Sequence, residues 1–170
     1  MILTGKKIIE EVKSNKITIS PFIKKRATTN SYDLSLGETI IRYTSKIIDP
    51  KSESSYEIIK IPEEGLVLNA GDFVLGHSNE KIGSDSYVPL IHGKSGTARM
   101  GLFVHVTADL IDIGSHGVTT FQLYATLPVR LYPNMLIAQV SFWVPFGKIA
   151  LYKGKYQNSV GPQVSKSWKD

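Results

Sequence analysis

Residues His92–Gly117 have the sequence HGKSGTARMGLFVHVTADLIDIGSHG, the most informative stretch of the chain. A small polar loop with two cations, Lys94 and Arg99, leads into an apolar run that is predicted to be a strand. The run ends at Asp112, beside a glycine-rich corner. Phosphoryl chemistry on a nucleotide requires cations and backbone donors near a fixed carboxylate, because the cations hold the charge and the carboxylate directs a water molecule.

Short β-type runs continue on both sides of this stretch. They are rich in Val, Ile, Thr and aromatic residues, and turn clusters such as Asn69–Asp72 separate them. The expected strands are 17–19, 38–44, 56–61, 66–78, 101–111, 117–126 and 135–144. Residues 4–14 have the pattern of a short helix, with Thr4 as its N-cap. Many strands without intervening helices predict an all-β sandwich, jelly roll or barrel.

The composition limits the class of protein. A length of 170 residues suits one domain, residues 1–170. Hydrophobic residues make up 42% of the chain and charged residues 21%, and this composition indicates neither disorder nor a membrane protein. No apolar run approaches the ~18 residues of a spanning helix and no signal peptide is evident, so a cytoplasmic protein is expected. The absence of cysteine excludes disulfides and thiolate metal sites. A net charge of +5 with scattered cations suits a solvated surface or a small anionic ligand; neither a nucleic-acid nor a membrane partner is expected.

Blocks along the chain together resemble the family shared by dCTP deaminases and trimeric dUTPases. They are MILTGKKI (1–8), SYDLSLG (31–37), FVLGHSNEKI (73–82), GKSGTARMGL (93–102), HVTADLIDIGSHG (105–117), LYPNMLIAQVSF (131–142) and KYQNSV (155–160). The resemblance implies an all-β, distorted β-barrel or jelly-roll subunit of the dUTPase-like (β-clip) kind with a short N-terminal helix. It also implies a homotrimer with active sites between subunits, and Mg²⁺ carried on the nucleotide triphosphate.

The resemblance implies a phosphate cradle, which matches the family's Arg-Ser-Ser-Leu-Ala-Arg segment. Its residues are Lys94, Ser95, Gly96, Thr97, Ala98 and Arg99. Lys94 keeps the charge of an arginine without its bidentate fork, and Gly96 lacks a hydroxyl. The alternative for Arg99 is an ion pair at a subunit interface. Asp112 is implied to contact the sugar and to orient the water that attacks the α-phosphorus; its alternative is a turn-forming aspartate.

Two further segments complete the implied nucleotide site. Thr120, Phe121 and Gln122 are the candidates for contacting the base, with core packing as the alternative for Phe121. Residues 152–170 are either a frayed terminus or a flap that closes over the ligand. In the flap reading, Tyr152 lies near the triphosphate, Lys155 meets the phosphates and Gln157 lies near the base or the phosphates.

Histidines give no metal-site pattern. All four are dispersed without metal-ligand spacing, so no protein metal ligands are expected. His105 lies in the predicted strand 101–111 and is expected to be an interior histidine.

Gln122 decides the predicted reaction. Deaminases of this family place a glutamate at the matching position, and an amide cannot shuttle protons between water and the cytosine ring. The sequence therefore predicts a dUTP diphosphatase that hydrolyses dUTP to dUMP and pyrophosphate, similar to archaeal-type dUTPases on the deaminase scaffold. The alternatives are a dCTP deaminase, with or without later hydrolysis or with Gln122 as a Glu-to-Gln substitution, and a catalytically inactive nucleotide-binding homologue.

Overall fold

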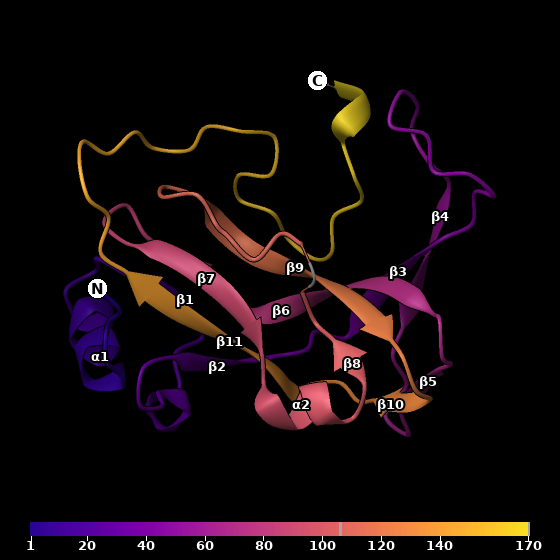
Figure 1. Ribbon diagram of the computed structural model, residues 1–170, viewed down its shortest axis with the longest axis horizontal. Coiled ribbons are helices and arrows are strands. Elements are labelled where there is room, and N and C mark those ends of the chain that lie inside the picture. The colour runs from indigo at the N-terminus through magenta and orange to yellow at the C-terminus, as the bar shows by residue number, and fades with distance from the viewer. Residues whose placement is uncertain (106, 170) are drawn as a thin grey trace.

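The computed structural model describes residues 1–105 and 107–169, and β-strands form most of its regular structure (Figure 1). The largest sheet has the strand order β4-β3-β6-β9-β8, with β1 paired to β6. Its strands are β1 (Thr18–Ser20), β3 (Thr39–Tyr43), β4 (Tyr56–Lys60), β6 (Phe73–Gly83), β8 (Leu102–Phe103) and β9 (His116–Ala125).

Two smaller sheets complete the architecture. One has the order β2-β11-β7, and the other pairs β10 with β5. Their strands are β2 (Tyr32–Ser35), β5 (Leu66–Leu68), β7 (Val88–Gly93), β10 (Val129–Leu131) and β11 (Leu136–Trp143). The predicted all-β fold is therefore confirmed, in the form of three open sheets.

The predicted N-terminal helix is also confirmed. Helix α1 spans Gly5–Lys13, and the Thr4 hydroxyl accepts a hydrogen bond from the Lys7 backbone N–H at 3.4 Å. Ile8 is fully buried on its inner face. The other helical segments are single turns: η1 (Lys24–Arg26), α2 (Ser95–Arg99) and η2 (Ser167–Lys169). In the described residues, no helix is long and apolar enough to cross a membrane.

Strand β9 packs one face against the core and turns its other face outward. Phe121, Leu123 and Ala125 alternate along it and are completely buried. In a strand, residues of the opposite parity face the other way, so Thr120 and Gln122 point away from this core. Burial of each large apolar side chain contributes about 1.5–3 kcal/mol, which fixes the register of β9 and the direction of its outward side chains.

Three local predictions are wrong. The run 101–111 is not one strand: β8 stops at Phe103, and within the described part of the run Leu110 forms only an isolated bridge to Leu90. Residues 95–99 form a helical turn instead of a loop. The run 66–78 is not one strand: the predicted turn Asn69–Asp72 divides it into β5 and β6, and there the Asp72 carboxylate accepts a hydrogen bond from the Asn69 N–H at 2.8 Å.

The C-terminal segment 152–169 runs along β9 and is hydrogen-bonded to it. Val118 donates its N–H to the Ser159 carbonyl at 3.1 Å, and the Ser159 hydroxyl donates to the Val118 carbonyl at 2.9 Å. Farther along, the Gln163 N–H donates to the Thr120 hydroxyl at 3.0 Å. Figure 1 shows this segment in yellow, at the end of the molecule opposite to α2.

A buried ion pair joins η1 to the large sheet. The Glu80 carboxylate on β6 is fully buried, accepts hydrogen bonds from the N–H of Ser35 at 2.9 Å and its hydroxyl at 2.7 Å, and pairs with the Arg26 guanidinium. Replacing Glu80 by alanine should lower the free energy of unfolding by about 3–5 kcal/mol, because Arg26 then loses the charge that balances it.

Denaturant unfolding at one fixed protein concentration measures this effect. Glu57→Ala is the matched control, since Glu57 forms an exposed pair with Arg42 at 3.5 Å and its loss should cost at most about 1 kcal/mol. Equal effects of the two substitutions would contradict a stabilising role for the buried pair.

Candidate active site

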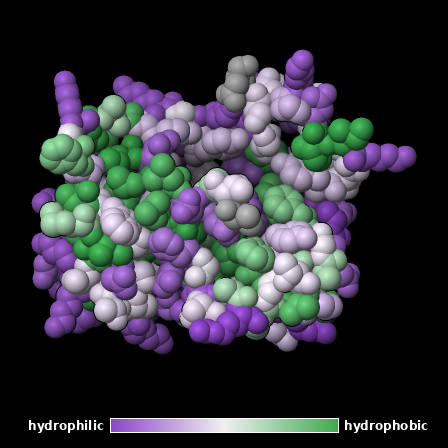
Figure 2. All heavy atoms as spheres, viewed as in Figure 1, coloured by the Kyte–Doolittle hydropathy of each residue, from purple (hydrophilic) through white to green (hydrophobic). Residues whose placement is uncertain are grey.

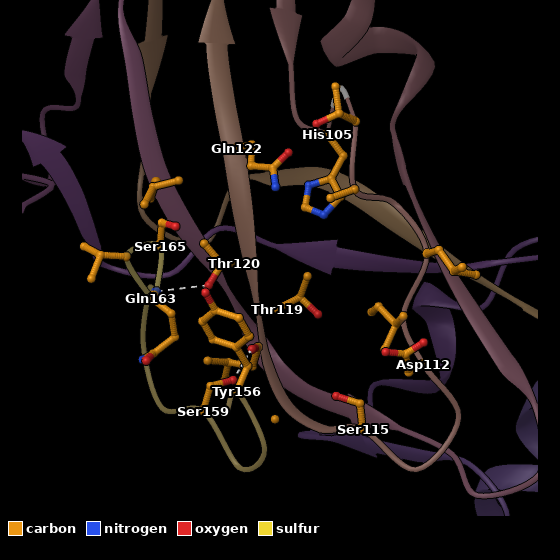
Figure 3. Close-up of a pocket in the computed structure, with 18 of the residues that line it drawn as sticks. His105, Asp112, Ser115, Thr119, Thr120, Gln122, Tyr156, Ser159, Gln163 and Ser165 are labelled. Carbon is orange, nitrogen blue, oxygen red and sulfur yellow. Dashed lines mark hydrogen bonds between the residues drawn. The ribbon is translucent and has the colours of Figure 1, made fainter. Parts of the chain in front are cut away.

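A cavity of about 730 Å³ lies on the outward face of β9. Its walls come from β9, from the loop between β8 and β9, from β3 and β6, and from the C-terminal segment (Figure 3). The lining combines aliphatic and aromatic side chains with a few hydroxyl, amide and carboxylate groups. Sites for small organic ligands commonly have this mixture, in which apolar surface gives affinity and a few polar groups fix orientation.

The base candidates on β9 divide between the two faces of the strand. Thr120 and Gln122 line the cavity, whereas the Phe121 side chain is completely buried. Phe121 therefore leaves only its main chain for a ligand. Among the residues that the structure describes, the Gln122 side-chain amide has no hydrogen-bond partner, so its oxygen and nitrogen are both available to a ligand.

Asp112 lies at the corner that leads into β9 and lines the same cavity. It is the only carboxylate in the lining among the described residues. A turn holds it, because the Ser115 N–H donates to the Asp112 carbonyl at 3.1 Å, and the Gly114 N–H donates to the Ser84 carbonyl at 2.8 Å. The carboxylate itself is exposed and has no partner in the described part of the chain, so both of its oxygens can accept hydrogen bonds from a ligand or from water.

The C-terminal segment covers one side of the cavity. Tyr152, Tyr156 and Ser159 are among its residues in the lining. Gly117 on β9 permits this close approach, since a Cβ atom there would lie 2.6 Å from the Ser159 hydroxyl and 2.8 Å from its backbone nitrogen. The structure thus brings Tyr152 to the cavity together with Asp112, Thr120 and Gln122.

Two other tail candidates are held away from the cavity lining. The Gln157 amide accepts from the His116 N–H at 2.8 Å and donates to the Gly114 carbonyl at 2.7 Å. Lys155 donates to the Lys166 carbonyl at 2.9 Å and lies 5.9 Å from the centre of the Tyr156 ring. In this arrangement Gln157 fastens the tail to the corner that carries Asp112.

The predicted phosphate cradle lies apart from the cavity. Lys94 is the N-cap of α2, and Ser95, Gly96, Thr97, Ala98 and Arg99 form the helical turn itself. Thr97 is buried, the other residues of the turn are exposed, and no cradle residue lines the cavity of its own chain. The Arg99 guanidinium makes no ion pair within the described residues.

Lys94 already has an anionic partner in the single chain. Its ammonium group pairs with the Asp33 carboxylate of β2. The other Asp33 oxygen is buried and lacks a hydrogen-bond partner among the described residues. A phosphate near Lys94 would therefore share its charge with Asp33, and Arg99 is the freer cation of the cradle.

His105 is a cavity residue that the sequence analysis missed. It lies in the loop after β8, not within a strand, and its ring forms part of the lining. Burial lowers its pKa below the usual 6.5, although Val104 and Asp109 act in the opposite direction. The apolar run around it does not distinguish a cavity wall from a strand, although His105 opens the block HVTADLIDIGSHG that carries part of the family resemblance.

No metal cluster is evident among the side chains of residues 1–105 and 107–169: they contain no group of three or more His, Cys, Asp or Glu arranged to hold an ion. Among the residues described, Asp112 is the one carboxylate in the cavity lining.

Comparisons with known proteins identify relatives over the whole chain. A family model described as dCTP deaminase-like matches residues 2–144. A "dCTP deaminase, dUMP-forming" from Clostridium beijerinckii is 43% identical over 171 residues, which cover 100% of this chain and 98% of the relative. Relatives with the same name from Hathewaya histolytica and Leptospira biflexa are each 39% identical, covering 100% of this chain and 99% and 98% of the relatives.

The fold has a counterpart among solved structures. A 2′-deoxycytidine 5′-triphosphate deaminase from Agrobacterium tumefaciens aligns with a TM-score of 0.68 and 19% identity, over 85% of this chain. The chain spans about half of that protein, 48% of its length. At this identity the likeness establishes the fold alone.

These relatives contradict the predicted main activity. All three carry the name of a dCTP deaminase and none that of a dUTP diphosphatase, so the prediction of plain dUTP hydrolysis is wrong, and the deaminase alternative is favoured. The match of the family model and the identity along the full length agree with each other. The chain belongs to the dCTP deaminase-like family.

Proposed function

We propose that this protein is a dUMP-forming dCTP deaminase. It removes the 4-amino group of dCTP as ammonia and cleaves the bond between the α- and β-phosphates, releasing pyrophosphate and consuming two water molecules. The observation that carries the proposal is the 43% identity, over 100% of the chain, to a relative that bears this name.

The cavity supports a pyrimidine nucleotide as the ligand. Thr120 and Gln122 present a hydroxyl and an amide that can pair with the edge of the base. Asp112 lies in the same lining, where it contacts the sugar and directs water to the α-phosphorus. A carboxylate suits this task because it stays ionised at pH 7 and accepts a proton from water.

The proposal includes a homotrimer with shared sites. The cradle on α2 lines no part of the cavity in its own chain, so it meets the triphosphate only if it comes from a neighbouring copy. Apolar side chains near α2 are exposed, among them Met100, Phe103 and Leu127. Figure 2 shows hydrophobic patches reaching the surface between polar ones, which is suited to contacts between subunits.

The triphosphate brings Mg²⁺ with it, as part of the substrate. The ion offsets phosphate charge, while Arg99, Ser95 and Lys94 of the cradle hold the phosphate oxygens. The segment 152–170, whose last residue lies outside the described part of the chain, acts as a flap over the bound nucleotide. Tyr152 lies at the cavity, and Lys155 moves from its bond to Lys166 onto the phosphates. A cytoplasmic location, expected from the composition, is part of the same proposal.

Product analysis tests the proposed function. The purified protein is incubated with dCTP and Mg²⁺, and the nucleotides are resolved by ion-exchange chromatography. We expect dUMP as the product. Formation of dCMP, or no conversion of dCTP, would contradict the proposal.

A further inference from the structure

The proposed deamination needs a group that takes a proton from water and returns it to the reacting base. A glutamate would supply this group, but the residue that lines the cavity from the middle of β9 is Gln122. Its amide can donate and accept hydrogen bonds, yet it cannot exchange protons near neutral pH. Another side chain in the cavity must therefore carry the transfers if the protein deaminates dCTP.

His105 lies beside Gln122 in the structure. The Gln122 backbone N–H donates to the Val104 carbonyl at 3.0 Å, which ties the loop of His105 to β9. The His105 ring meets Phe121 edge-on, with 6.2 Å between ring centres and an angle of 81°. Figure 3 shows the His105 ring next to the Gln122 amide, both reaching into the cavity.

Hydrogen bonding fixes which ring nitrogen of His105 carries the proton. Nδ1 lies 2.9 Å from the Val104 carbonyl oxygen, and a carbonyl can only accept, so Nδ1 donates its hydrogen. Nε2 is then the nitrogen with a free lone pair. It has no hydrogen-bond partner in residues 1–105 and 107–169, so it is available to a ligand or to water.

The surroundings keep this imidazole neutral at pH 7. Burial lowers the pKa of His105, and the charge of Asp109 on the same loop opposes this only in part. The other ionisable groups at the cavity are Asp112 at the corner, Tyr124 on β9, Tyr43 on β3, and Tyr152 and Tyr156 of the tail. A neutral imidazole can accept a proton from water, and the imidazolium that results is a strong enough acid to return it.

We propose that Nε2 of His105 carries the proton transfers of deamination in this protein, a role that rests on the proposed function. Nε2 takes a proton from the attacking water as its oxygen bonds to C4 of cytosine, and gives this proton to N3. It then takes the proton of the new C4 hydroxyl and gives it to the amino group as the C4–N4 bond breaks. Ammonia leaves, uracil keeps its proton on N3, and His105 returns to its neutral form.

Gln122 then serves binding and not proton transfer. Its amide oxygen accepts from the amino group of the cytosine before the reaction, and its amide nitrogen donates to O4 of uracil afterwards. An uncharged amide suits both states, because the side chain can turn to present either end.

The test follows ammonia released from dCTP in a single turnover, with the protein in saturating excess over dCTP, from pH 5 to pH 8. The rate for the unmodified protein should fall on the acid side, around a pKa below 6.5, because the protonated imidazole cannot accept a proton. An acid limb that persists unchanged when His105 is replaced would overturn the proposal.

His105→Asn gives the second measurement. Asparagine can still donate to the Val104 carbonyl but has no basic nitrogen, so ammonia release should fall by about 10²–10⁴-fold and the acid limb should disappear. The control is His77→Asn, since His77 bonds Thr39 and the Ser78 carbonyl and does not line the cavity; it should keep the acid limb. Thermal unfolding checks that both variants fold.

The outcomes separate the two proposals. If the unmodified protein releases ammonia and His105→Asn does so with the same pH profile, the role of His105 is wrong and the proposed function stands. If the unmodified protein releases no ammonia from dCTP at any pH, the proposed function is wrong, and the role of His105 falls with it.

Discussion

Replacing Asp112 by asparagine should leave dUTP, and not dUMP, as the product formed from dCTP. The amide keeps the shape of the side chain but cannot accept a proton from the water that attacks the α-phosphorus. Loss of a general base typically costs about 10²–10⁴-fold in rate. Ammonia release, which in our account depends on His105, should continue, so the two halves of the reaction become uncoupled. Chromatography of the nucleotides, with ammonia measured in the same sample, follows both.

The position of Asp112 makes this experiment specific. Asp112 is the only carboxylate of the cavity lining in the described part of the chain, so no neighbour can replace it. Asp49→Asn is the control: Asp49 caps the Lys51 N–H at 2.9 Å in an exposed turn outside the cavity, and its loss should leave dUMP formation unchanged. Formation of dUMP by the Asp112 variant at the unmodified rate would remove Asp112 from the mechanism.

Replacing Arg99 by alanine should abolish turnover in the homogeneous protein, and mixing with the Asp112→Asn variant should restore dUMP formation. Arg99 is exposed on α2 and lacks an ion-pair partner among the described residues, so it is the cradle cation most available to the triphosphate. If each site joins the cradle of one subunit to the cavity of the next, about one third of the sites in trimers that contain both variants have both intact halves.

Co-expression with two different affinity tags, followed by tandem purification, gives the mixed assemblies for this measurement. Each variant alone, purified in the same way, is the control for residual activity. A site built within one chain would always carry one of the two defects, so no dUMP formation in the mixture would contradict the shared site.

Some of the fold could be predicted because burial leaves a periodic signal. Helix α1 has a capping threonine and an apolar stripe, and the structure shows it at Gly5–Lys13. Strand β9 alternates between buried and outward residues. Its expected range, 117–126, therefore matches the observed His116–Ala125 to within one residue at each end. The core therefore determines where Thr120 and Gln122 point, and both line the cavity.

The loop after β8 and the C-terminal segment leave no periodic signal of this kind in the sequence. The apolar run after β8 was expected to be a strand, but Thr107, Ala108, Leu110 and Ile111 form a cavity wall, and an apolar wall has the same composition as a buried strand. The role of the tail depends on contacts between residues far apart in sequence. Gln157 bonds the corner at Gly114 and His116, and no local pattern predicts such a pairing.

The predicted reaction was wrong for a chemical reason. A dUTP diphosphatase is predicted from one position, Gln122, on the premise that only this position could transfer protons. The relatives that share 39–43% of the sequence are named for deamination, and the structure brings His105 to the same cavity. Under the role that we propose for His105, one missing carboxylate does not define the reaction, because a second basic group lies beside it.

In our proposal, one protein releases both ammonia and pyrophosphate from dCTP. The most direct test measures the two products in the same reaction with dCTP and Mg²⁺, using a coupled assay for each. We expect equal amounts of ammonia and pyrophosphate throughout the reaction. Pyrophosphate released from dUTP, with no ammonia released from dCTP, would contradict the proposal.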